Sequence, residues 1–225
     1  MGEERPPDPL TSFISRSLRS AVTDVSDEIL RDTTDVELDR VRFTQDGTRR
    51  TLIVKRVPPH SSLEVTLLPH LAWKSDRVPI VHARGIPPTT VAAWPWLLIE
   101  DLVDAPPARD GDAIVRAKVA VERAVGADGP ALVALGVPRI ARRGPLAEWP
   151  EVLVHGALTP EHAVLAERGV VLVEWRHASL GAGLIDVVRL ARDAGLPERP
   201  LALRYAAEVG RTLSDESLRA AHELL

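Results

Sequence analysis

The residues best suited to chemistry lie close together in the second half of the chain: His155, His162, Glu174 and His177. Imidazole and carboxylate groups bind metal ions and transfer protons, so metal-assisted and acid–base chemistry are the first classes to consider. The spacing of these four residues fits no compact zinc signature. The chain also contains no cysteine and no G-x-S-x-G motif, which excludes thiolate chemistry and disfavours a serine hydrolase.

Three short apolar runs must position these residues, at 152–154, 163–165 and 170–173. Between the last two runs, Glu167-Arg168-Gly169 is typical of a tight turn. We therefore expect short strands joined as a hairpin that presents the loop 155–162 and Glu174 at one end. A helix from about 184 to 193 should follow, ended by Gly195-Leu196-Pro197.

This stretch resembles the catalytic segment of the aminoglycoside phosphotransferase and choline kinase-like family, which has a protein kinase-like fold. The matching positions are His155-Gly156, Leu158, Pro160, Gly169, Trp175, Gly181 and Asp186. The resemblance implies an α+β fold of two lobes: a small antiparallel-sheet N-lobe and a reduced, mainly helical C-lobe. It also implies a structural role for Asp186.

Three chemical positions depart from the family pattern. Ala157 stands where the family has its catalytic aspartate, His162 replaces a metal-binding asparagine, and Glu174 replaces a metal-binding aspartate. Alanine cannot accept a proton, and the loss of a general base typically costs about a hundredfold to ten-thousandfold in rate. Glu174 keeps the charge that a magnesium ligand needs, whereas His162 is a poorer substitute because magnesium prefers oxygen. No catalytic residue is predicted, and Glu174 and His162 are the candidate metal ligands.

The first hundred residues match the N-lobe that the resemblance implies. A helix is expected from Thr11 and a short helix at 24–29, followed by a strand at 36–43 with a bulge between 38 and 41. The turn 45–48 leads to a strand at 49–57, and the helix 61–73 precedes strands at 78–81 and 96–99. Five strands in all, including the four named above, are expected between about residues 36 and 99.

Lys55 is the candidate for binding nucleotide phosphates. Period-two alternation places it on one strand face with Ile53 and Val57, and the family has its phosphate-pairing lysine on such a strand. Glu64 is then the helix glutamate that pairs with this lysine. Two alternatives stay open: Lys55 as an edge-strand lysine that discourages aggregation, and Glu64 as part of a capping box with Ser61. We also expect Lys55 to approach Glu174, with Glu64 as the competing partner.

Glu100 and Leu102 lie where the family links its lobes and where the backbone of the link meets the adenine ring. A Gly-rich phosphate loop is missing, because the hairpin before Lys55 offers only Gly47. ATP and Mg²⁺ are therefore expected as cofactors only if residual binding is retained.

Three segments are expected: a disordered leader at 1–10, an N-terminal helix with the β-rich N-lobe at 11–102, and a helical C-lobe at 103–225 that contains the hairpin 152–175. Helices are predicted at 112–126, 200–211 and 214–225, the last with Ser214 as N-cap and Ser217 as the alternative. The net charge of −4 gives no reason to expect a nucleic acid partner. No apolar run reaches the length of a membrane span, so the cytoplasm is the default location.

Together these features predict a catalytically impaired phosphotransferase-like protein, a pseudokinase that binds a small molecule or a protein partner. The alternative is an active, atypical small-molecule kinase that transfers the ATP γ-phosphate to a hydroxyl and uses Glu174 to hold the metal. An unrelated α+β domain with a coincidental match is the third possibility.

Overall fold

The computed structural model describes residues 9–87, 93–126 and 128–225. The chain forms two compact units: unit 1 comprises residues 1–65 and 80–101, and unit 2 comprises residues 66–79 and 102–225. Most of the predicted leader, residues 1–8, lies outside the described residues. Pro9 and Leu10 were expected to belong to it, but they form the first turn of helix α1 (Pro9–Leu18), where a proline without an N–H is tolerated.

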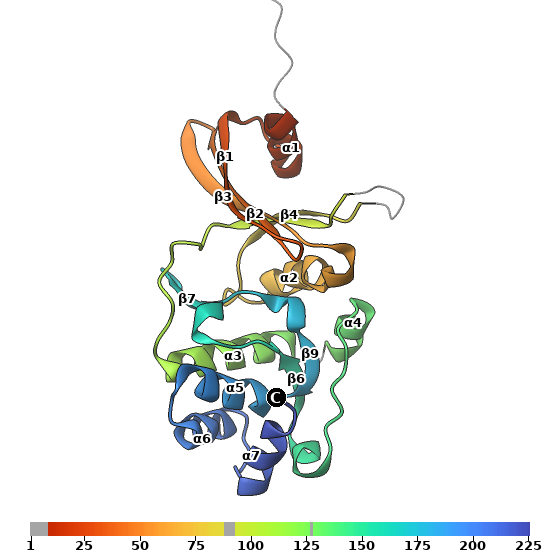
Figure 1. Cartoon of the computed structure of the whole chain (residues 1–225), viewed down its shortest axis with the longest axis vertical. Helices are drawn as coiled ribbons and strands as arrows, with labels where there is room; N and C mark the ends of the chain where they lie inside the picture. Colours follow the sequence, from red (N-terminus) through yellow and green to blue (C-terminus); the bar gives the residue numbers. More distant parts are fainter. Residues whose placement is uncertain (1–8, 88–92, 127) are drawn as a thin grey trace, which may run out of the picture. The chain divides into compact units, whose positions relative to one another are not determined.

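Unit 1 contains one antiparallel sheet of five strands in the order β1-β2-β3-β5-β4 (Figure 1). The strands are β1 (Thr23–Asp32), β2 (Glu37–Gln45), β3 (Thr48–Arg56), β4 (Val81–Gly85) and β5 (Trp96–Glu100). Asp46 and Gly47 join β2 to β3, and both have positive φ, 50° and 73°. Two such residues match the right-handed twist of the flanking strands, so the predicted hairpin is confirmed.

The first strand corrects the prediction of a short helix at 24–29. Glu28 pairs in register with Arg40 of β2, and its carboxylate also lies 2.6 Å from the guanidinium of Arg42. These cross-strand partners outweigh the local preference of Asp27-Glu28 for a helix start. With β1 included the sheet has five strands, but only four of them lie between residues 36 and 100.

Two further details of the sheet differ from expectation. The pairing of β2 with β3 is continuous from Glu37 to Gln45, so the predicted bulge is not in this ladder. Register shifts occur instead in β1, between Thr23 and Ser26 and between Ile29 and Arg31. The strand expected at 78–81 begins only at Val81. Pro79 has no N–H to contribute to a ladder, which explains the later start.

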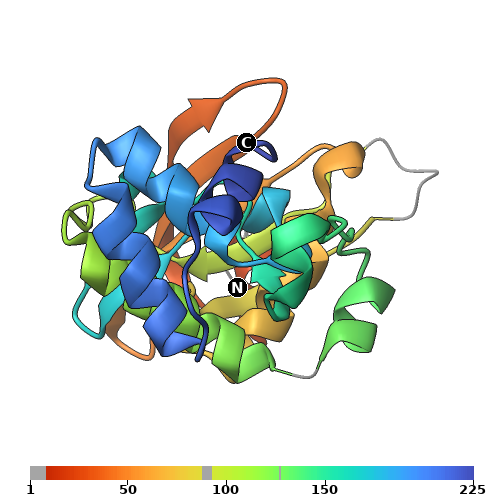
Figure 2. The same cartoon turned by 90° about the horizontal axis from the view of Figure 1, so that it is seen from below.

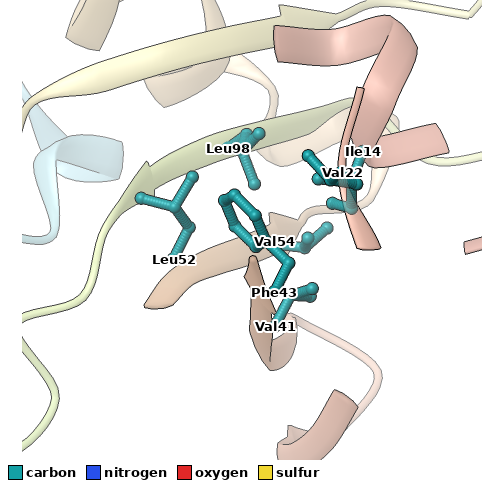
Figure 3. Close-up of a cluster of buried hydrophobic side chains, with 7 residues drawn as sticks. All are labelled: Ile14, Val22, Val41, Phe43, Leu52, Val54 and Leu98. Atoms are coloured by element: carbon teal, nitrogen blue, oxygen red, sulfur yellow. The ribbon is translucent and has the colours of Figure 1, made fainter. Parts of the chain in front are cut away.

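Helix α1 and one face of the sheet enclose the core of unit 1. Figure 3 shows seven buried side chains that meet there: Ile14, Val22, Val41, Phe43, Leu52, Val54 and Leu98. Because side chains alternate along a strand, Leu52 and Val54 face this core while Ile53 and Lys55 point to the opposite face of β3.

Helix α2 (Leu63–Lys74) follows the short 3₁₀ turn η1 (Pro59–Ser61), and its last nine residues group with unit 2. The other helices of unit 2 are α3 (Gly111–Val125), α4 (Gly129–Ala134), α5 (Leu184–Ala194), α6 (Glu198–Glu208) and α7 (Asp215–His222). Figures 1 and 2 show α5, α6 and α7 packed side by side. Ser214 caps α7 by accepting a hydrogen bond from the N–H of Ser217, and Gly195 ends α5 at φ 63°, both as predicted.

Four short strands of unit 2 frame the predicted loop. Strand β7 (Ala163–Ala166) and β8 (Gly169–Leu172) form the expected hairpin. Strand β6 (Glu151–Val154) pairs instead with β9 (Ser179–Ala182), which the sequence did not predict. Ser-Leu-Gly-Ala lacks the β-branched and aromatic residues of a typical strand, yet all four residues are buried. In the described part of the chain, no helix is long and apolar enough to cross a membrane.

Candidate functional site

The loop that follows β6 is held by the carboxylate of Asp186, from the first turn of α5. The backbone N–H of His155 donates to Asp186 Oδ2 at 2.7 Å, and that of Gly156 donates to Oδ1 at 2.9 Å. Asp186 is fully buried. Gly156 has φ 80°, and a Cβ there would collide with the backbone oxygen of His177, so only glycine fits. The structural role expected for Asp186 is thus visible as two hydrogen bonds that shape the loop.

His155 is a buried, neutral member of the same loop. Its Nε2 lies 2.8 Å from the carbonyl of Val173; a carbonyl only accepts, so Nε2 carries the proton. Nδ1 then accepts from the N–H of Ala157 at 3.3 Å. Burial lowers the pKa of His155 to about 4, although the Asp186 carboxylate opposes this shift. Both ring nitrogens of His155 are thus engaged by the backbone, so the imidazole holds the loop in place.

Ala157 presents a methyl group where the family has its catalytic carboxylate. Its carbonyl accepts a hydrogen bond from Nδ1 of His162 at 2.6 Å. His162 ends η3 (Pro160–His162) and is half-buried. Because a carbonyl only accepts hydrogen bonds, Nδ1 is the donor here. The imidazole thus orders the loop through the backbone of Ala157.

Glu174 follows β8 in an unusual backbone conformation, with φ 66° and ψ 58°. A non-glycine residue in this left-handed region costs of order 1–3 kcal/mol and needs support from its surroundings. Its carboxylate lies 3.5 Å from the guanidinium of Arg176 and is 22% exposed. Next to it, His177 has its pKa lowered by burial first and by the charge of Arg176 second.

These residues do not form a complete metal site by themselves. Within residues 9–87, 93–126 and 128–225, no group of three or more His, Cys, Asp or Glu side chains could hold a metal ion. The donor set also fits magnesium poorly, because Glu174 supplies one carboxylate that already faces Arg176 while His162 supplies nitrogen. The roles of Glu174 and His162 as metal ligands stay predictions.

In unit 1, Lys55 and Glu64 form a buried ion pair. Nζ of Lys55 lies 2.6 Å from Oε2 of Glu64, and the side chains are 4% and 2% exposed. Strand β3 lies between β2 and β5 in the sheet, so Lys55 as an edge-strand lysine is wrong. Ser61 lies inside η1 and α2 begins at Leu63, so the predicted capping box from Ser61 does not form either. Glu64 proves to be the partner of Lys55; the approach of Lys55 to Glu174 concerns two separate units and stays a prediction.

Glu100 and Leu102, the residues predicted to meet adenine, lie at the end of β5 and just after it. Oε2 of Glu100 accepts from the N–H of Ile80 at 3.2 Å, and the carbonyl of Leu102 accepts from the N–H of Ala105 at 3.1 Å. Between them, the Asp101 carboxylate lies 2.7 Å from Nε of Arg40. These contacts fix the segment, and its binding of adenine stays a prediction.

Neither tight connection of the first three strands has the small residues that a phosphate-binding loop needs. Residues 33–36 join β1 to β2 and contain no glycine; the N–H of Thr33 donates to the carbonyl of Val36 at 3.1 Å. The β2–β3 turn contains only Gly47. Neither turn therefore allows several backbone N–H groups to approach a phosphate closely.

Sequence reasoning missed a buried polar cluster behind the loop. Lys118 and Glu122 of α3 and Tyr205 of α6 are each at most 5% exposed, and Nζ of Lys118 lies 3.5 Å from Asp186 Oδ2. A signal was present, because Lys118 and Glu122 fall four residues apart on the face of α3 that carries Ile114. Charged residues on the apolar face of a helix predict buried partners.

Comparison with known proteins places this geometry in a known fold. No protein-family model matches the sequence, and no curated protein matches it. Among solved structures, macrolide 2'-phosphotransferase MphH from Brachybacterium faecium superposes with a TM-score of 0.63 at 18% identity, over 97% of this chain and 88% of that one.

Two further phosphotransferases are similar to the same extent. Spectinomycin phosphotransferase APH(9)-Ia, in complex with ADP and spectinomycin, gives a TM-score of 0.64 at 7% identity, over 97% of this chain and 84% of that one. The GDP complex of wild-type aminoglycoside 2'-phosphotransferase-IIIa gives 0.62 at 13% identity, over 94% and 85%. The chain has the kinase-like fold of the aminoglycoside and macrolide phosphotransferases, as the resemblance implied.

Proposed function

We propose that this protein is a pseudokinase: a catalytically impaired phosphotransferase-like protein that binds a ligand or a protein partner. One observation carries the proposal. The loop 155–157 keeps its two hydrogen bonds to Asp186, but the residue it presents is alanine. Phosphoryl transfer depends on a group that orients the acceptor hydroxyl and receives its proton, and a methyl group does neither.

Two further features support impairment. Neither the 33–36 connection nor the β2–β3 turn has the run of small residues that would cradle phosphates. The positions where the family binds its metal offer fewer oxygen ligands for magnesium here, because His162 replaces an amide oxygen with nitrogen. These losses affect three separate requirements of one reaction, so restoring a single residue should not recover it.

The alternative, an active atypical kinase, draws support from unit 1. The Lys55–Glu64 pair is in place, and in protein kinases this pair must be formed for activity. In that case Glu174 would hold the metal ion, and Nε2 of His162 would be a candidate base in the loop, since only Nδ1 binds the Ala157 carbonyl.

A paired binding and activity experiment separates the two functions. Thermal unfolding is followed with ATP, alone and with Mg²⁺ or Mn²⁺, and phosphate transfer is measured with aminoglycosides, choline and simple sugars as acceptors. We expect no transfer above background, and none from Ala157→Asp. Turnover that disappears in Glu174→Ala would show that the alternative is right. The matched control is Glu161→Ala, which removes an exposed carboxylate from the loop 155–162.

A further inference from the structure

Next to the loop lies a cluster of buried polar side chains, of which the proposed function uses only Asp186. Its members are Lys118 and Glu122 from α3, Asp186 from α5 and Tyr205 from α6, and all are buried. Lys118 pairs with Glu122 one helical turn away and lies 3.5 Å from Asp186. The Tyr205 hydroxyl lies 3.2 and 3.1 Å from the two carboxylate oxygens of Glu122.

The cluster is built for one cation between two carboxylates. Lys118 lies over the ring of Tyr205, 4.9 Å from its centroid, a geometry in which the ring also favours the charged ammonium. Burial raises the pKa of Tyr205, so its hydroxyl keeps its proton and donates to Glu122. A Cβ at Gly183 would collide with Tyr205, Glu122 and Lys118. The glycine therefore leaves the room in which the three side chains meet.

The link to the loop runs through Asp186. Both of its oxygens accept from loop N–H groups, and hydrogen bonds to an ionised carboxylate are about twice as strong as neutral ones. A buried carboxylate without a cation is relieved most readily by taking up a proton, which weakens its capacity to accept. Removal of the Lys118 cation, which lies 3.5 Å from Asp186 Oδ2, should therefore weaken the two hydrogen bonds that shape residues 155–157.

We propose that Lys118 is the positioning residue of the loop 155–157, acting through Asp186 and shared with Glu122. The cluster then fixes the conformation of residues 155–157 without any bound nucleotide or metal. The proposal concerns the conformation of the loop, so it stands or fails separately from the pseudokinase assignment. The titratable groups that face Asp186 are the other cluster members, Lys118, Glu122 and Tyr205, and also His155. His155 is neutral near pH 7 because burial lowers its pKa to about 4.

The test follows the backbone amides of His155 and Gly156 by NMR-detected hydrogen exchange across pH. In Lys118→Met, we expect these two amides to lose at least about tenfold in protection relative to the interior amides of α5, as when a hydrogen bond to a charged group weakens. The pH at which they lose protection on acidification should also move upward. Lys74→Met is the matched control, because Lys74 pairs with Asp128 away from the loop.

A second variant changes the same balance in the opposite direction. Glu122→Gln keeps an oxygen for the Tyr205 hydroxyl but leaves the charge of Lys118 to Asp186 alone, so the loss of protection should move to lower pH. A uniform loss of protection in Lys118→Met, with no selective effect at His155 and Gly156, would overturn the proposal. If Lys118→Met does not fold, Glu122→Gln decides: a midpoint that is unchanged or raised rejects the positioning role.

Discussion

Lys55 in unit 1 and Lys118 in unit 2 are 4% and 2% exposed, but their surroundings differ. Within unit 1, Lys55 pairs with Glu64. Lys118 faces two carboxylates and an aromatic ring, and burial lowers its pKa while Asp186 opposes the shift. Lys118 is therefore shared between two carboxylates, and one of them, Asp186, holds a backbone loop. A buried ion pair can often be exchanged for apolar side chains, whereas Asp186 cannot be exchanged without releasing the loop.

The largest effect should follow the loss of the shared cation. Lys118→Met leaves Glu122 and Asp186 buried without a counter-charge, and removing one partner of a buried ion pair typically costs about 3–5 kcal/mol. We expect the free energy of unfolding, measured with urea, to fall by the upper part of that range. An equal loss in Lys74→Met would contradict this reasoning, since Lys74 is partly exposed.

Breaking the Lys55–Glu64 pair should lower the free energy of unfolding by somewhat less, and removing both charges should restore most of that loss. Lys55→Met alone is expected to lower the free energy of unfolding by about 3 kcal/mol. Lys55→Met combined with Glu64→Leu removes both charges and should restore most of it, because apolar groups often replace a buried pair without loss. A double variant that is no more stable than Lys55→Met would contradict this expectation.

The free energy of unfolding should fall in acid because His155 is neutral in the folded protein. The pKa of His155 falls from 6.5 to about 4 on folding, so the unfolded chain binds more protons between these values. The stability contribution is complete above about pH 6.5 and is lost as pH falls toward 4, in total roughly 3 kcal/mol. Urea unfolding at several pH values should show this slope in the wild type and a shallower one in His155→Gln.

The smallest effect should come from Tyr205→Phe. This change keeps the ring beneath Lys118 and removes only the hydroxyl that donates to Glu122, so about 1–3 kcal/mol is expected. Arg204→Ala in the same helix, where the side chain is 42% exposed, is a suitable comparison in urea unfolding. A loss as large as that of Lys118→Met would mean that the hydroxyl, and not the cation, organises the cluster.

Local spacing was sufficient to predict some of these features and not others. The β7–β8 hairpin and the Asp46-Gly47 turn follow from short motifs in which neighbouring residues determine the geometry. The structural role of Asp186 and the partnership of Lys55 with Glu64 came from the family resemblance, since both join residues that are distant in the sequence or lie on different elements. Glu174, His162, Glu100 and Leu102 remain predicted ligands.

The missed features depend on residues far apart in the chain. Strand β1 reads locally as a helix start, and the arginines that favour the strand lie 12 and 14 residues further along, at positions 40 and 42. Lys118 meets Asp186 across 68 positions, and β9 is identified only by its partner β6. Charged residues on an apolar helix face were the one visible sign of the cluster.

The path of the backbone between the units has a consequence for how the gene can be divided. The chain leaves unit 1 after Val65, passes through residues 66–79 of unit 2, and returns for residues 80–101. The first crossing falls inside α2, which runs from Leu63 to Lys74. No single cut in the coding sequence can therefore separate the two units. A cut after residue 101 leaves residues 66–79 with unit 1, and a cut after residue 65 leaves residues 80–101 with unit 2 and also divides a helix. In either case one fragment lacks a segment of its unit that the other fragment carries.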